Sequence, residues 1–144
     1  MLKISSFILL IGLLFCHLAS AQDTTDVVRL RNLSYMDQDL VQRIDCDNIT
    51  DNLSTRICAN LAFQDVDKRM NEQLLLHLEQ IANDSVREEV ATYHQAWVAH
   101  RRLQSYKASA GYRGHMLGLV YLDHMIRLTE WRLAELLYLN NREK

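Results

Sequence analysis

The sequence has 144 residues, of which 49% are hydrophobic and 24% charged, and its formal net charge at pH 7 is −2. This length limits the chain to one domain of ordinary size and excludes a multidomain protein. The ordinary apolar content and the nearly balanced charge exclude a disordered chain and a strongly basic nucleic-acid binder.

The first 21 residues have the pattern of a secretory signal. Their one charged residue, Lys3, precedes an apolar run at 7–18 and the small residues of 19–21. This order predicts a signal peptide over 1–21 that is cleaved before Gln22, and hence a periplasmic or secreted protein. The apolar run is too short to cross a bilayer, so we expect no membrane span. Removal of these 21 residues takes the chain from 144 to 123 residues and, because Lys3 is lost, its formal charge from −2 to −3.

Three cysteines are present, one of them inside the predicted signal. This Cys16 follows Phe15, whereas lipoprotein processing requires a small residue at that position, so we expect no lipid anchor. Cys46 and Cys58 remain in the mature chain. Two cysteines in an exported protein indicate one disulfide.

Turn-forming residues are scarce. The chain has no proline, and only three of its four glycines follow residue 21. Sheets need such residues at regular intervals, so the composition predicts an all-α fold. We expect a small three-helix domain, an α-hairpin plus an additional helix, over 46–140. It would follow a partly flexible lead-in at 22–45, where 37–44 could form two helical turns, and precede a short tail at 141–144.

A helical pattern begins near Thr50 and continues to Ile81. It has two apolar faces that do not coincide. One face holds Leu53, Ile57 and Leu61, and the other holds Phe63, Val66, Met70, Leu74, His77 or Leu78, and Ile81. Either this helix is covered on two sides or it breaks near Leu61, and both alternatives remain open.

The four residues from Ser85 to Glu88 have the form of a capping box, which predicts a second helix that begins at Ser85. An apolar seam follows, made of Val86, Val90, Tyr93, Trp97 and His100. Its alternation by four and three is typical of a seam that two helices share. On this seam we expect His100 to be a hydrogen-bonded structural histidine.

The segment 108–118 contains all three remaining glycines and is the expected loop before a third helix, which runs from about His115 to Asn140. The main apolar stripe of that helix consists of Leu119, Leu122, Ile126, Thr129, Leu133 and Leu136. Further apolar residues surround most of the same helix. So much apolar surface indicates burial on more than one side or a partner, which leaves homo-oligomerisation open.

The chain has no catalytic motif of the kinds that can be read from short spacings. It lacks Gly-x-Ser-x-Gly, a phosphate loop and His-Glu-x-x-His, and no two histidines of the mature chain are four residues apart. The acids around Cys46 form a local solvated run rather than a pair across a cleft. Arg101, Arg102 and Lys107 are too few for a nucleic-acid groove. We therefore expect no enzyme activity, no metal and no cofactor.

Four short motifs occur in order along the mature chain. They are the pair Cys46 and Cys58, the run Asp67-Lys-Arg-Met-Asn71, the run Gln95-Ala-Trp97-Val-Ala-His-Arg101, and the run Leu128-Thr129-x-x-Arg132-x-x-x-Leu136. Between Cys46 and Leu137 the chain thereby resembles the LprI-type lysozyme-inhibitor family of small helical proteins exported by bacteria. The corresponding runs in the family are Asp-x-x-Leu-Asn, Gln-x-Trp-x-x-x-Arg and Leu-Thr-x-x-Arg-x-x-x-Leu.

The chain departs from the family pattern at one pair of positions. Many members carry a second cysteine pair, four residues after the arginine and five before the threonine, where this chain has Ser105 and His124. Packing must then replace the second bridge between the second and third helices. A disulfide contributes about 2–4 kcal/mol, so we expect these two helices to be the softer pair.

The resemblance implies binding rather than catalysis, with a protein partner that for the family is a lysozyme. C-type lysozymes are basic and use two cleft carboxylates, so the negative charge of the mature chain would assist their approach. The glycine-rich loop offers four side chains for insertion into such a cleft: Lys107, Tyr112, Arg113 and His115. The alternative is that this loop only connects two helices.

The motif residues themselves are expected to be structural, with Arg101 holding a carboxylate or a helix end. They are Asp67, Asn71, Trp97, Arg101, Thr129 and Arg132. A second hypothesis for function is an envelope or secretion-linked protein, including one of the immunity type, that binds a different protein target.

Overall fold

The computed structural model describes residues 25–142, so the predicted signal peptide and the last two residues lie outside the described part. The described chain contains five helices: α2 (Thr25–Arg31), α3 (Gln38–Val41), α4 (Asn52–Gln80), α5 (Asp84–Ser109) and α6 (Gly114–Arg142). The prediction of an all-α fold built on three long helices is confirmed. None of the described helices is long and apolar enough to cross a membrane.

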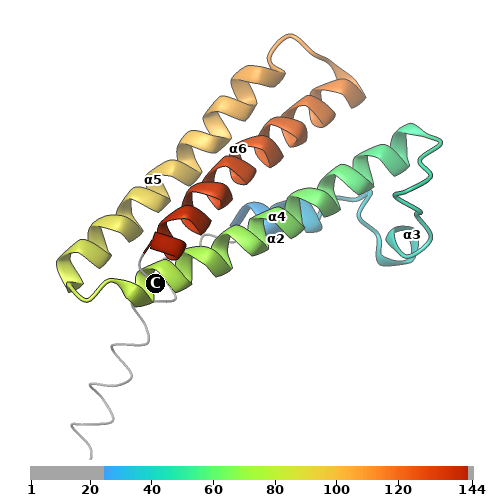
Figure 1. The fold of residues 1–144 in the computed structure, drawn as a ribbon. Helices are drawn as coiled ribbons and strands as arrows, with labels where there is room; N and C mark the ends of the chain where they lie inside the picture. Colours follow the sequence, from blue (N-terminus) through green and yellow to red (C-terminus); the bar gives the residue numbers. More distant parts are fainter. Residues whose placement is uncertain (1–24, 143–144) are drawn as a thin grey trace, which may run out of the picture.

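The three long helices pack with α6 between the other two. Helix α6 contacts α4 along much of its length and α5 along its other side, whereas α4 and α5 contact each other little although they are consecutive in the chain (Figure 1). The short helix α2 lies against α4. The direct contact between α4 and α5 includes a hydrogen bond near their connection, which Arg87 of α5 donates to the carbonyl of Leu78 of α4.

Helix α4 begins at an aspartate cap and continues without a break past Leu61. Asp51 accepts hydrogen bonds from the backbone amides of Leu53 and Ser54 and from the Ser54 hydroxyl. These bonds, those from Ser54 above all, lower the pKa of the Asp51 carboxyl below its ordinary value. The helix is covered on two sides, by α6 and by α2, although Leu53 of the first predicted face remains 41% exposed.

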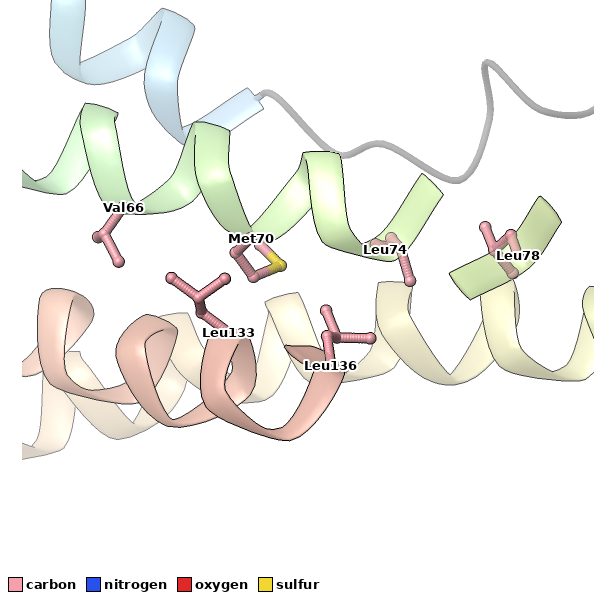
Figure 2. Packing of buried hydrophobic residues seen from close by; sticks show 6 residues of the cluster. All are labelled: Val66, Met70, Leu74, Leu78, Leu133 and Leu136. Atoms are coloured by element: carbon pink, nitrogen blue, oxygen red, sulfur yellow. The ribbon is translucent and has the colours of Figure 1, made fainter. Parts of the chain in front are cut away.

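Two buried apolar clusters hold the long helices together. Figure 2 shows the larger cluster, in which side chains of α4 point toward those of α6. It consists of Val66, Met70, Leu74, Leu78, Leu133 and Leu136. The second cluster joins Leu30 of α2 to Phe63 of α4 and to Leu122 and Met125 of α6. The first cluster uses the stripes predicted for the first and third helices, whereas the second also includes Met125, which lies outside the predicted stripe, and Leu30 of the expected lead-in.

The expected lead-in is more ordered than the sequence indicated. Residues 25–31 form α2, which buries Asp26 and Leu30. The amide of Asn60 in α4 donates to the backbone carbonyl of Leu30 at 2.9 Å. Seven residues are too few for a sustained periodicity to be recognised, and this is why the pattern of the sequence did not reveal the helix.

Helix α5 differs from its prediction in both its start and its buried face. Its cap is Asn83, whose side chain accepts from the amides of Ser85 and Val86, so Ser85 lies inside the helix and does not form the expected capping box. The buried residues are His94, Val98, Arg101, Ser105 and Ser109. Tyr93 is 55% exposed and His100 is exposed, with its Nε2 3.1 Å from the amide of Gln104. The predicted seam was thus displaced by about one residue, because much of the true face is polar.

Helix α6 buries most of its predicted stripe, in which Leu119 and Ile126 are partly buried, and leaves an aromatic face uncovered. Thr129 and Leu136 are fully buried, whereas Trp131 is 70% and Tyr138 is 62% exposed. Burial within the three-helix fold therefore does not account for all the apolar residues of this helix. Its exposed face is available to a partner.

The structure confirms the disulfide between Cys46 and Cys58, which closes the loop that leads into α4. We expect mass spectrometry of the exported protein to find no free thiol. Reduction should lower the free energy of unfolding by about 3 kcal/mol, because it releases a closed loop of this size in the unfolded chain. Equal melting temperatures of the oxidised and reduced protein would contradict this expectation.

Candidate functional site

The motif residues of three helices meet at the side chain of Arg101. Its Nη1 donates to Asp67 Oδ1 of α4 at 2.6 Å and to Thr129 Oγ1 of α6 at 2.9 Å. Its Nη2 donates to Asp26 Oδ2 of α2 at 3.0 Å. Arg101 and Thr129 have no exposed surface, and each aspartate side chain is 1% exposed. Of the two partners expected for Arg101, a carboxylate or a helix end, the structure shows carboxylates, and Arg101 holds two.

Aromatic rings and further hydrogen bonds enclose this buried ionic cluster, which we define as Asp26, Asp67, Arg101 and Thr129. The guanidinium carbon of Arg101 lies 5.1 Å from the ring centroid of Phe63 and 5.0 Å from that of Trp97. The Trp97 ring also stacks on the buried ring of His94. The Thr129 hydroxyl donates to the carbonyl of Met125, so its oxygen is free to accept from Arg101.

Asn71 and Arg102 extend the cluster on either side. Asn71 Nδ2 donates to both the side chain and the backbone carbonyl of Asp67. Arg102, which is 35% exposed, donates from Nε to Asp26 Oδ1 at 2.9 Å. Each buried aspartate is therefore paired with a cation, which burial of a charge requires. The cluster thereby joins side chains of four helices, α2, α4, α5 and α6.

Sequence reasoning missed Asp26. It lies outside the four motifs, in a segment without recognisable periodicity. The signal that could have pointed to it is the adjacent pair Arg101 and Arg102, which needs acidic partners wherever it is buried.

The remaining motif residue, Arg132, lies apart from the cluster. Its side chain is 5% exposed, and its Nη1 donates to Glu135 Oε2 at 2.6 Å. Its guanidinium carbon lies 5.0 Å from the ring centroid of Tyr93. Arg132 thus links α6 to α5 at a point that is nearer to the α4–α5 connection than the buried ionic cluster is.

The structure brings the candidate loop residues together at one end of the α5–α6 hairpin (Figure 1). The turn is closed by hydrogen bonds from the amide of Ala110 to the carbonyl of Lys107 and from the amide of Tyr112 to that of Ser109. Gly111 and Gly114 have φ angles of 95° and 56°, which other residues rarely adopt.

The candidate side chains differ in exposure. Lys107 and Arg113 are exposed, Tyr112 is 47% exposed, and His115 is partly buried. The loop therefore presents two cations and one aromatic ring to solvent. The two positions of the missing cysteine pair lie on the helices that this loop joins, Ser105 on α5 and His124 on α6.

Fold and site together define a small helical protein, closed by a disulfide and organised around a buried ionic cluster. Among residues 25–142, no group of three or more histidines, cysteines, aspartates or glutamates is placed to hold a metal ion. Residues 46–136 match the family described as lysozyme inhibitor LprI, and this is more than half of the chain. The chain belongs to the LprI lysozyme inhibitor family. Comparison with curated proteins found no match, and comparison with solved structures found none.

Proposed function

We propose that the protein is an exported lysozyme-inhibitor-like protein that acts in the periplasm or outside the cell by stoichiometric binding, not by catalysis. The observation that carries this proposal is the family match over 46–136. The amino-terminal pattern supports export, because residues 1–21 have the order of a cleaved signal.

The α5–α6 loop is the proposed contact with a lysozyme. Lys107, in the last turn of α5, and Arg113, in the turn that follows, are exposed cations, and Tyr112 lies between them in sequence. An inhibitor can block an acidic catalytic cleft by placing donor side chains against the two carboxylates. The formal charge of −3 of the mature chain would separately attract a basic enzyme from a distance.

The test is a titration of the oxidised mature protein into a hen-type lysozyme acting on cell walls. We expect inhibition that saturates near one to one and that weakens as salt rises, because charge assists the encounter. Replacing Lys107, Tyr112 and Arg113 together with alanine should abolish inhibition. The matched control replaces Lys68, Arg69 and Leu76, which are exposed on α4 away from the loop and from the aromatic face of α6, and should inhibit normally.

The exposed aromatic face of α6 supports a second candidate, an envelope or secretion-linked protein with a different protein target. Trp131 and Tyr138 are residue types that dominate binding energy at protein interfaces. A folded chain that leaves lysozyme fully active would remove the first function and favour this one. Capture of a partner that is lost on replacing Trp131 with alanine would then identify the surface.

A further inference from the structure

An open pocket of about 310 Å³ lies where α4, α5 and α6 meet, on the side of the connection between α4 and α5. Its lining is contributed by all three helices: His77, Val86, Glu89, Val90, Tyr93, Arg132 and Leu139. This volume is at the lower end of the range of about 300–1,000 Å³ that is typical of small-molecule sites. The pocket lies near the opposite end of α5 from the candidate lysozyme-binding loop.

Arg132 gives this pocket a nearly buried cation with an unused hydrogen-bonding edge. Only its Nη1 is occupied by Glu135, and Nε has no hydrogen-bond partner among the described residues. A carboxylate fits the edge of a guanidinium with two parallel N–H···O bonds. Tyr93 lies over the guanidinium and restricts its orientation.

His77 adds a second polar group to the same pocket. Its side chain is 8% exposed, and within the described part of the chain its Nδ1 has no hydrogen-bond partner. Val86, Val90 and Leu139 provide apolar walls. The pocket is therefore lined by an arginine that pairs with Glu135 through Nη1 and has an unpartnered Nε, by a histidine with an unpartnered Nδ1, and by an apolar wall.

We propose that this pocket binds an organic carboxylate that carries a short apolar chain, with Arg132 holding the carboxylate and His77 completing its hydrogen bonding. A free short-chain acid and the C-terminal carboxylate of a peptide both have this chemistry. Glu89 lines the pocket from an exposed position and opposes an anion, so Glu89→Gln should strengthen binding. The proposal does not depend on lysozyme binding, because it uses none of the loop residues.

The experiment is an NMR titration of the oxidised mature protein with hexanoate and with N-acetyl-alanyl-alanine, each compared with its amide. We expect each acid that binds to do so at least about tenfold more tightly than its amide and to shift the Nε–H resonance of Arg132. Tighter binding of hexanoate would assign a free acid, and tighter binding of the dipeptide would assign a peptide end. Equal binding of acid and amide, or no binding of either acid, would overturn the proposal.

Two pairs of variants locate the site without relying on one substitution. Arg132→Gln should abolish acid binding, whereas Arg127→Gln, on the exposed side of the same helix, should not. Because Arg132 is buried, Val86→Trp provides a second block that fills the pocket from a residue that is 44% exposed. Its control is Leu103→Trp, at a residue 49% exposed on the same helix and outside the pocket lining. Normal hexanoate binding by a folded Val86→Trp protein would overturn the assignment.

Discussion

Replacing Arg101 with methionine should lower the free energy of unfolding by about 3–5 kcal/mol, the largest effect we expect from a single substitution. Methionine retains much of the side-chain length and can still pack against Phe63 and Trp97. It removes the cation that Asp67 and Asp26 share at 2.6 and 3.0 Å. The two nearly buried carboxylates would then lose the cation that they share, and burying them without it is unfavourable. Urea denaturation would measure the resulting decrease in the free energy of unfolding.

The control for this substitution is Arg127→Met on α6. Arg127 pairs with Asp123 at 2.7 Å, but both side chains are more than half exposed. Exposed pairs contribute about 0–1 kcal/mol, so the control should melt close to the unmodified protein. Arg101→Lys should also be unstable, because one ammonium group cannot reproduce the planar fork that reaches two carboxylates and a hydroxyl. A loss below about 1 kcal/mol for Arg101→Met would show that the cluster does not hold the helices together.

The apolar stripes of α4 and α6 could be predicted because their buried residues are mostly hydrophobic and follow the helical period. The face of α5 could not be predicted in the same way. His94, Arg101, Ser105 and Ser109 are buried there, and a search for apolar periodicity passes over all four. Val90 and Trp97 of the predicted seam do pack against the core, but Val86 and Tyr93 are exposed, so the predicted seam was displaced by about one residue from the buried face.

At the candidate site, the sequence identified the motif residues but not all of their interaction partners. The family-like motifs singled out Asp67, Arg101 and Thr129, which are far apart in the sequence and meet in the fold. A sequence motif does not show which of its side chains form hydrogen bonds or ion pairs with one another. It also gives no information about residues outside the family pattern. Asp26 precedes the matched range of 46–136, so its role follows only from the packing of α2 against the rest of the chain.

A mature chain that begins at Asn32 should be less stable by about 3–5 kcal/mol than one that begins at Thr25. The shorter chain loses Leu30, which packs with Phe63 and Met125, and Asp26, which binds Arg101. We would compare their melting temperatures, with Leu30→Ala and Val28→Ala as point variants. Because Leu30 is 6% exposed, Leu30→Ala should lower the free energy of unfolding by about 2–5 kcal/mol. Val28 is 54% exposed, so Val28→Ala should change the free energy of unfolding little.

The substitution Asp26→Asn, which keeps the shape of the side chain and removes its charge, separates the contribution of the ion pairs of Asp26 from that of the packing of Leu30. If the ion pairs with Arg101 and Arg102 hold α2 in place, Asp26→Asn should lower the melting temperature of the chain that begins at Thr25. The chain that begins at Asn32 lacks residue 26, and its melting temperature is the reference for complete loss of α2. Equal melting of the chains that begin at Thr25 and Asn32 would mean that the folded unit starts with the disulfide. The expected difference would instead place its start at α2, about twenty residues before the family pattern begins.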